Sequence, residues 1–514
     1  MVQQNKHINF VVAGLLLAIF MSAMDNTIVA TAMGSIVADL GGVQQFVWVT
    51  SAYMVAVMAG MPIFGKLSDM YGRKRFFVFG LTVFLVGSAL CGLAQSMVQL
   101  SIYRAIQGIG GGALMPIAFT IVFDIFPPEK RGKMTGLLGA VFGLSSVFGP
   151  LLGAYITEYI SWHWIFYVNV PIGAASLFLI LKYYKESPSH SKPRIDWWGA
   201  STLVIAVVAL MFALELGGKE MGGRVLEWSS LPIISLFAVF FIFFIVFLYA
   251  ETKASEPIIS FWMFKRRLFA SSQILAFLYG ATFISLTVYI PIFVQAVYGG
   301  SATSAGLILT PMMLGSVAGS SIGGIFQTKT SYRNLMVISI ITYAAGMYLL
   351  STISPDTERW MLTVFMVLVG FGVGFSFPLL PTASIHNLEV HHRGSANSTN
   401  QFFRSLGMTL GITILGSIQS KTFASKLEQS FADAPGGGIQ MGDFGDPREI
   451  FEPEQRAQIP DFVLDKIVDA MSSSITYMFL LSLIPIALAA AAVFYMGGER
   501  IEIRKRIEQP EVSE

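Results

Sequence analysis

Two charged residues, Asp25 and Arg104, lie inside long apolar runs of this sequence. If such a run crosses a membrane, a charge at its centre costs roughly 2.5–3.5 kcal/mol on insertion scales, so the residue is a functional candidate by default. A desolvated carboxyl group such as that of Asp25 is suited to binding and releasing a proton. The alternative is a structural carboxylate that is neutralised by hydrogen bonds to Asn26 or Thr27.

Three charged residues besides Asp25 are candidates, and each has more than one interpretation. Arg104, in the fourth apolar run, can pair with Asp25 across a helix bundle or hold backbone carbonyl groups. Arg404, near the start of the thirteenth run, either lies within the membrane or extends its guanidinium to the interface. Glu215, near the end of the seventh run, either lies at headgroup level or takes part in transport.

The segment between the second and third apolar runs combines glycines with charged residues. Its glycines, Gly65 and Gly72, allow a tight turn, and Asp69 can cap a helix N-terminus. Arg73 is the first of three consecutive bases, which can face anionic lipid. A role in anchoring this loop to anionic lipid explains the three bases, but it does not explain the positions of the aspartate and the glycines.

The sequence contains no recognisable catalytic or metal-binding motif. The segment from Gly60 to Lys66 imitates a phosphate-binding loop, but Leu67 stands where that loop needs a magnesium-binding hydroxyl. Cys91 is the single cysteine, which excludes an internal disulfide. We therefore expect a protein that is not an enzyme, has no cofactor or metal and binds no nucleic acid, and whose energy comes from an ion gradient.

The elements that must position these residues are membrane helices. The chain has 514 residues, 54% hydrophobic and 12% charged, whereas soluble proteins carry about 25% charged residues. Continuous apolar runs of about 20 residues, enough to cross a bilayer, indicate helices rather than a barrel. We predict fourteen spans, near residues 11–33, 46–65, 76–95, 98–121, 134–157, 164–182, 198–216, 231–250, 269–294, 302–326, 334–352, 360–384, 398–419 and 474–496.

The distribution of lysine and arginine predicts the orientation of these spans. Basic residues concentrate in alternate loops and in the tail, which predicts that both termini are cytoplasmic. The segment 420–473 then lies outside, and residues 460–470 have the pattern of a short amphipathic helix. This segment is either a surface hairpin that covers the outer mouth or a docking site for another protein.

Several of these segments together resemble the major facilitator superfamily. The segment from Gly65 to Arg75 resembles the family's signature between helices two and three, and the segment 104–110 resembles its fourth-helix motif. The segment 162–173 and the Asp25 segment are similar to motifs of the fourteen-helix drug:proton antiporter branch. The fifth helix carries residues similar to the antiporter motif: Gly139, Gly143, Gly149, Pro150 and Gly153.

The resemblance implies an all-α integral membrane protein with the major facilitator fold, its fourteen helices arranged 6+2+6. The implied division is a six-helix bundle in 1–185, two inserted helices in 186–265, a second six-helix bundle in 266–497 that includes the 420–473 hairpin, and a cytoplasmic tail in 498–514. The two bundles are expected to rock around a central cavity.

The resemblance also implies roles for individual residues. Asp25 is expected to be a carboxylate that binds a proton or a cation, assisted by Arg104 in proton exchange.

Asp69 is expected to face the N-terminus of the thirteenth helix, near 395–400, where the helix dipole favours an anion. Arg73 is expected to pair with Asp124, and these contacts would close an inner gate that includes Gly65 and Gly72. The Gly149–Pro150 pair would shape the fifth helix so that the cavity does not leak.

The predicted function is proton-driven export of amphiphilic drugs across a bacterial cytoplasmic membrane, by a protein that works as a monomer among membrane lipids. Some members of the family that the chain resembles export dicationic drugs and have extra carboxylates in helices ten and thirteen. Spans 302–326 and 398–419 contain no acidic residue, so the resemblance implies monocationic, zwitterionic or neutral substrates rather than dications. Two alternatives remain. One is an importer or uniporter of a small metabolite, and the other is a membrane receptor or scaffold that uses the 420–473 segment.

Overall fold

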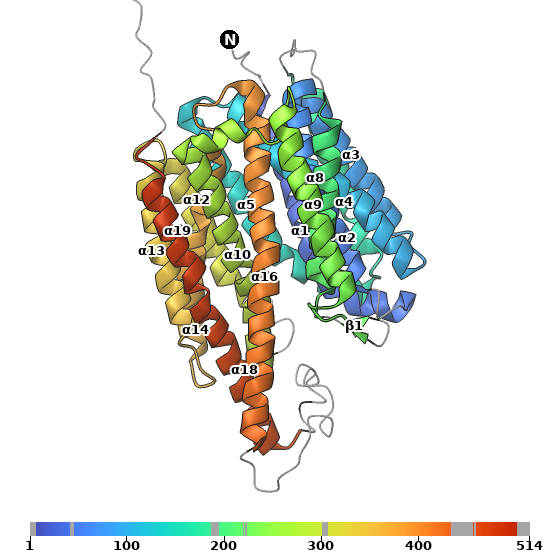
Figure 1. Cartoon of the computed structure of the whole chain (residues 1–514), viewed down its shortest axis with the longest axis vertical. Helices are drawn as coiled ribbons and strands as arrows, with labels where there is room; N and C mark the ends of the chain where they lie inside the picture. The colour runs from blue at the N-terminus through green and yellow to red at the C-terminus, as the bar shows by residue number, and fades with distance from the viewer. Residues whose placement is uncertain are drawn as a thin grey trace, which may run out of the picture.

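The protein is a bundle of long helices that run roughly parallel to one another (Figure 1). The computed structural model describes residues 7–41, 46–186, 195–218, 220–221, 224–300, 307–432, 456 and 459–500. In its first half the helices are α1 (Ile8–Leu40), α2 (Phe46–Tyr71), α3 (Arg73–Cys91), α4 (Met97–Ile125), α5 (Pro128–Tyr159), α6 (Trp164–Tyr167) and α7 (Asn169–Tyr183). The middle of the chain forms α8 (Trp197–Leu216), the strands β1 (Glu220–Met221) and β2 (Arg224–Val225), and α9 (Leu231–Lys253).

The second half repeats the helical pattern with more breaks. Its elements are η1 (Phe261–Lys265), α10 (Arg267–Ala296), α12 (Leu309–Phe326), α13 (Tyr332–Leu350), α14 (Arg359–Gly374), α15 (Ser376–Ser384), η2 (Val390–His392), α16 (Arg393–Ala432), α18 (Asp461–Leu481) and α19 (Leu483–Tyr495). In lipid a helix satisfies its own backbone hydrogen bonds, which is why these apolar runs take this form. The antiparallel ribbon of β1 and β2 is the exception, and it was not predicted.

Each half of the chain has its own apolar core. In the first half α1 packs on α5 and α7, and α4 packs on α2 and α3. In the second half α10 packs on α16 and α19, and α14 packs on α12 and α13. The inserted helices α8 and α9 pack on each other, and α8 lies against α2 and α16. The halves meet where α5 contacts α12 and α15, and where α16 contacts α2 and α4.

Within the described residues, thirteen helices are long and apolar enough to cross a membrane. The predicted span that is not among them is the thirteenth, 398–419, which corresponds to α16, whose first half is rich in polar side chains. Those side chains are buried against other helices rather than in lipid: Asn397 Nδ2 donates to the Pro116 carbonyl at 2.7 Å and Asn400 Nδ2 to the Ser272 carbonyl at 3.1 Å. A helix with this many internal hydrogen bonds can lie in a membrane bundle despite its lower apolarity.

Several predicted boundaries were wrong. The span predicted at 11–33 is the 33-residue helix α1, and the span predicted at 398–419 is the 40-residue helix α16. The amphipathic helix predicted at 460–470 is not separate, because it forms the start of α18. Helices α16 and α18 pack on each other beyond the rest of the bundle (Figure 1), so much of the 420–473 segment is helical. Residues 433–455 and the tail from 501 lie outside the described residues.

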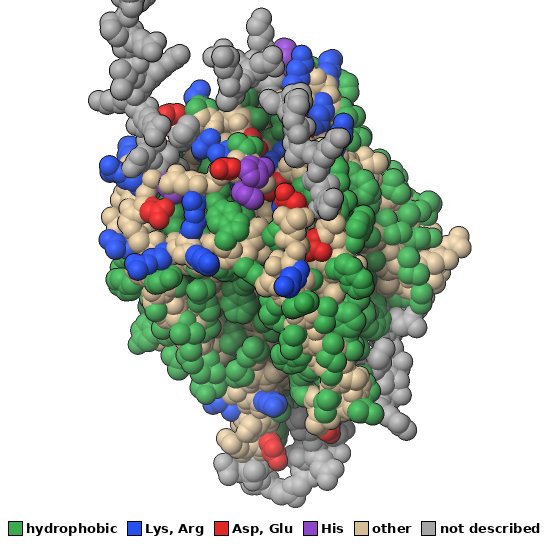
Figure 2. Space-filling view, turned by 45° about the horizontal axis from the view of Figure 1, so that its top comes forward, with side chains coloured by type: hydrophobic (Ala, Val, Ile, Leu, Met, Phe, Trp, Pro, Cys, Tyr) green, Lys and Arg blue, Asp and Glu red, His purple; other side chains and the backbone are tan. Residues whose placement is uncertain are grey.

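The surface agrees with a membrane environment. Figure 2 shows hydrophobic side chains covering the flank of the bundle, with lysine and arginine side chains gathered at one end. That end also carries the start of α1 and the start of α16 (Figure 1). We call it the basic end.

Candidate functional site

Asp25 lies in the middle of α1 and is fully buried among side chains of α4 and α7. Its Oδ2 is 2.5 Å from Nη1 of Arg104, which is 1% exposed. Its Oδ1 accepts hydrogen bonds from Gln107 Nε2 and from Asn169 Nδ2, both at 2.8 Å. The carboxylate therefore has one charged and two neutral donors, as a buried charge requires.

Arg104 keeps several contacts besides Asp25. Its Nη1 donates to Gln107 Oε1 at 2.7 Å and its Nε to the Val49 carbonyl at 3.3 Å. The guanidinium carbon lies 4.0 Å from the centre of the Tyr53 ring, which is a favourable cation–π distance. Both arrangements considered from the sequence thus occur together, since Arg104 pairs with the carboxylate and also holds a backbone carbonyl.

The local partners considered for Asp25 do not neutralise it. Asn26 Nδ2 donates to the Ser22 carbonyl at 3.3 Å, and Thr27 Oγ1 donates to the Met24 carbonyl at 3.0 Å. Both side chains bond to their own helix because the carboxylate points to the other side of α1.

Gln107 and Asn169 are site residues that sequence reasoning missed. Both lie in segments that resemble family motifs, but neither was given a role. Asn169 is the first residue of α7, where it also donates to Ser88 Oγ at 3.0 Å. Both amides are fully buried. A buried amide in a membrane helix needs partners, and that requirement was the available signal.

A second constellation joins the two halves of the chain at the basic end. Oδ1 of Asp69, near the end of α2, accepts the backbone N–H of Gly394 at 2.8 Å, and its Oδ2 accepts that of Ser395 at 2.6 Å. These are the free N–H groups of the first turn of α16, where the helix dipole also favours a negative charge. The contact expected between Asp69 and the thirteenth helix is therefore present.

Arg73 is the centre of this constellation. It pairs with Asp69 and, through Nε, with Oδ2 of Asp124 at 3.0 Å. Its Nη2 donates to the carbonyl of Val390, in the second half, at 2.8 Å. Asp124 in turn receives Arg393 Nη1 on Oδ1 at 2.9 Å. The expected pair of Arg73 and Asp124 is present, whereas the bridge to Arg393 was missed. We call these residues the latch.

The inserted helices are tied to the latch through the segment that follows α9. Lys66 Nζ is 2.6 Å from Oε2 of Glu256, and Ser395 Oγ donates to the Ile258 carbonyl at 2.6 Å. Nearby, burial and then positive neighbours lower the pKa of His392. That histidine therefore takes up a proton less readily than usual, and the charge of the latch comes from its carboxylates and arginines.

The two glycines of the signature segment serve different needs. A Cβ on Gly65 would collide with the side chain of Ser398, so only glycine lets α2 approach α16 this closely. Gly72 has a φ of 109°, a conformation that other residues rarely adopt. The turn at Gly72 directs the N–H groups of Arg73 and Lys74 to the carboxylate of Glu186, which caps α3.

The glycines of the fifth helix lie on two different interfaces. Gly139 faces α12 and α15, where a Cβ would lie 3.0 Å from the Cβ of Phe377. Gly149 and Gly153 face α1, and a Cβ on Gly149 would overlap the hydroxyl of Thr27. Pro150 lies inside α5 between Gly149 and Gly153. A Cβ on Gly143 would have no neighbour closer than 3.8 Å. The structure thus places α5 between α1 and the second half.

The two remaining candidates lie apart from Asp25. Arg404 Nη2 donates to the Ser376 carbonyl at 3.0 Å, so its guanidinium remains within the bundle and does not extend to the interface. Glu215 is half-buried in the last turn of α8, at the end opposite the latch. Neither residue contacts the Asp25 network.

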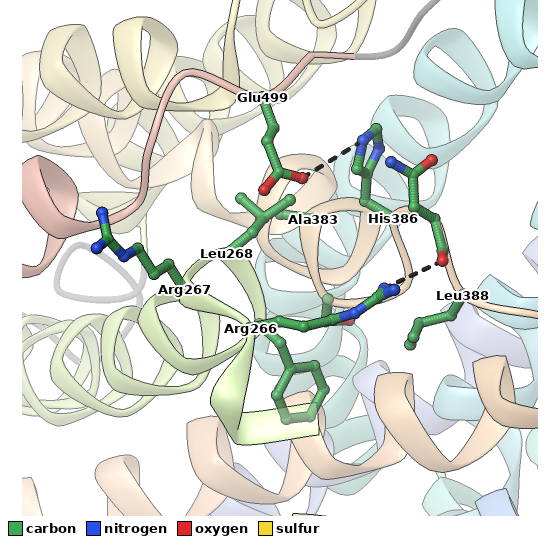
Figure 3. A pocket seen from close by; sticks show the side chains of 10 residues that line it. Arg266, Arg267, Leu268, Ala383, His386, Leu388 and Glu499 are labelled. Carbon is green, nitrogen blue, oxygen red and sulfur yellow. Dashed lines mark hydrogen bonds and ion pairs between the residues drawn. The ribbon is translucent and has the colours of Figure 1, made fainter. Parts of the chain in front are cut away.

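A pocket of about 360 Å³ lies at the basic end beside the latch (Figure 3). Arg266 Nη1 donates there to the Asn387 carbonyl at 3.0 Å, and His386 Nε2 is 3.7 Å from Oε2 of Glu499. All of its lining residues come from the second half of the chain. The pocket therefore does not lie on a path between the two halves.

Taken together, a charge sealed inside a membrane bundle and a latch between two helical halves define a multi-pass membrane transporter rather than an enzyme. The chain belongs to the Major Facilitator Superfamily, whose family model matches residues 15–412. The fold class expected from the sequence is thereby confirmed.

Known relatives cover almost the whole chain. It is 68% identical over 495 residues to "Multidrug resistance protein 3" of Bacillus subtilis (strain 168), covering 96% of each chain. It is 34% identical over 518 residues to "Multidrug transporter protein MdtP" of the same organism, covering 97% of this chain and 95% of that one.

Solved structures show the same fold at low identity. The human organic anion transporter MFSD10 matches with a TM-score of 0.57 and 14% identity, over 95% of this chain and all of that one. A bacterial homologue of the lysosomal transporter Spinster, in an inward-facing conformation, matches with a TM-score of 0.53 and 17% identity, over 96% and 98% of the two chains.

Proposed function

We propose that the protein exports amphiphilic drugs from the cytoplasm in exchange for protons, by alternating access. The observation that carries this proposal is the Asp25–Arg104 pair, fully buried in the middle of the first bundle. The two Bacillus relatives, which are named as multidrug proteins, support the substrate class. Substrates are small amphiphiles, and the chain acts as a monomer in the cell membrane.

Proton binding at Asp25 must compete with Arg104. When the carboxyl group takes a proton, the ion pair is lost. Arg104 then keeps only its contacts with Gln107, the Val49 carbonyl and the Tyr53 ring. A buried cation that has lost its counter-ion is unfavourable, so the protonated site favours a different packing of the helices around it. This is the physical link that we propose between proton binding and movement of the bundle.

The latch is proposed to be the inner gate, closed in this conformation. Its contacts join α2, α3 and α4 of the first half to η2 and α16 of the second half. From the middle of α1 towards its end away from the latch several side chains are exposed, among them Asn26 and Thr31. A polar Asn26 in mid-span favours a water-filled space on that face rather than lipid. We infer that the central space opens to the outside here, with the basic end and both termini cytoplasmic.

The domain division remains that of the sequence prediction, with bundles in 1–185 and 266–497 around the inserted pair in 186–265. The separate apolar cores of the two halves support it. Each proton that moves inward contributes about 2.3 kcal/mol per 100 mV of membrane potential and about 1.36 kcal/mol per pH unit. One or two protons therefore support a useful gradient of a neutral or monocationic drug.

Inverted membrane vesicles test this function directly. We expect vesicles that carry the protein to accumulate a fluorescent monocationic dye when their lumen is acidified, and to lose it when a protonophore is added. Vesicles without the protein are the control. Accumulation only in right-side-out vesicles, driven by an inward proton gradient, would instead show an importer.

A further inference from the structure

Arg404 is a partly buried arginine for which the structure gives no acidic partner among the described residues. Its Nη1 donates to Ser376 Oγ at 3.2 Å and its Nη2 to the Ser376 carbonyl at 3.0 Å. Its Nε is buried and makes no hydrogen bond. Arg104, by contrast, has Asp25 as its counter-ion. One neutral residue therefore supplies all the hydrogen bonds of a full positive charge in the membrane interior.

The surroundings of Arg404 place it where the two halves meet. Its guanidinium carbon lies 4.8 Å from the centre of the Phe377 ring, on α15. That ring lies 5.5 Å from the ring of Phe142, on α5 of the other half, and 6.0 Å from that of Phe283, on α10. Ser405, the next residue of α16, contacts Met61 of α2. The cation thus lies beside an aromatic cluster built from both halves.

Part of the Arg404 surface is still accessible, although Ser376 beside it is fully buried. A charge inside a membrane bundle is normally paired or faces a cavity. Here the pair is missing, so an anionic group that reaches the accessible part of the Arg404 side chain would gain an ion pair. Guanidinium and carboxylate match in shape and bond strongly, often through two parallel hydrogen bonds.

We propose that Arg404 recognises a carboxylate on the substrate, while the rings of Phe142, Phe283 and Phe377 hold the substrate's aromatic part. The protein then takes aromatic carboxylates, including zwitterions, in addition to the monocationic and neutral substrates considered above. This inference rests on the proposed export function because it takes the bound compound to be a transported substrate. The binding itself does not require transport. Because the Asp25 network is sealed inside the first half, the substrate's charge and the coupled proton occupy different places.

A purely structural role is the competing explanation. Helix α14 ends at Gly374 and α15 begins at Ser376, so Arg404 also braces a break between two helices. A brace would stabilise the fold without regard to the charge of the substrate, and this difference allows a test.

The test measures equilibrium binding of three matched compounds to the purified protein in lipid nanodiscs, without any gradient. All three carry one naphthalene ring, with a carboxylate, the methyl ester of that carboxylate, or a trimethylammonium group. We expect the native protein to bind the carboxylate at least tenfold more tightly than the ester. In Arg404→Gln this preference should disappear while the ester and the cation bind as before, and Arg404→Lys should retain part of it.

The outcomes separate the explanations. A native protein without preference for the carboxylate would overturn the proposal, even if both variants failed to fold. If Arg404→Gln bound all three compounds more weakly by the same factor, Arg404 would have only the structural role of bracing the helix break. Because binding is measured at equilibrium, a preference that persists in a protein unable to carry out pH-driven export would refute the proposed function and leave this inference standing.

Discussion

Thr27 of α1 and Gly149 of α5 touch directly, with the glycine lying against the threonine hydroxyl. This contact is two residues beyond Asp25, on the side of α1 that faces away from Arg104. Helix α1 is thus held between the charged network on α4 and the glycine surface of α5. If α1 moves after proton binding, it must slide along the glycine surface of α5.

Adding one methyl group at this contact should therefore impair coupling. We predict that Gly149→Ala lowers pH-driven export at least tenfold, because overpacking a tight contact costs about 1–3 kcal/mol. The matched control is Gly143→Ala on the same helix, where the nearest atom to the added carbon is 3.8 Å away. Export rates in proteoliposomes check this. Equal rates in the two variants would contradict a role for the contact.

The latch should control access from the basic end. We predict that Arg73→Ala increases maleimide labelling of a cysteine placed at Thr120 at least tenfold, in a protein whose Cys91 is replaced by serine. Thr120 is fully buried on α4 behind the latch, and breaking a buried ion pair destabilises the closed arrangement by about 3–5 kcal/mol. The exposed Arg75 provides the control, as Arg75→Ala.

Asp124→Asn should act in the same direction as Arg73→Ala, because Asp124 bridges Arg73 and Arg393. If labelling in both variants stayed at the level of the Arg75→Ala control, the latch would not be a gate.

Asn169 should matter for both stability and transport. We predict that Asn169→Ala lowers the free energy of unfolding by about 1–3 kcal/mol, since the Asp25 carboxylate loses a buried donor. Export should fall severalfold as well. Thermal melting and transport assays check this against Asn334→Ala, which removes an exposed amide on α13. A variant that melts and transports like the native protein would show that Asn169 only fills space.

Much of the fold follows from the sequence because a bilayer leaves few choices. Apolar runs of span length must be helices. Among the described residues, thirteen of the fourteen predicted spans correspond, in the predicted order, to helices long and apolar enough to cross a membrane. The ends of α1 and α16 were misplaced because amphipathic and polar residues can extend a helix beyond the apolar layer. The pattern of hydrophobicity does not register such extensions, and they depend on partners such as α18.

The candidate site was only partly predictable, for a similar reason. A charge such as Asp25 stands out in an apolar run, whereas a buried amide such as Gln107 does not. The bridge from Asp124 to Arg393 joins residues 269 positions apart in the sequence, and their pairing depends on how the halves close. Hydropathy and spacing carry no information on that geometry.

The account depends most on Asp25, and replacing its carboxyl group gives the most direct measurement. Proteoliposomes with Asp25→Asn should lose pH-driven export of a monocationic dye while still exchanging labelled for unlabelled dye at equal pH. Asp39→Asn, which changes the other carboxyl group of α1, should export at close to the native rate. Export by Asp25→Asn that still follows an imposed pH gradient would contradict the proposed mechanism.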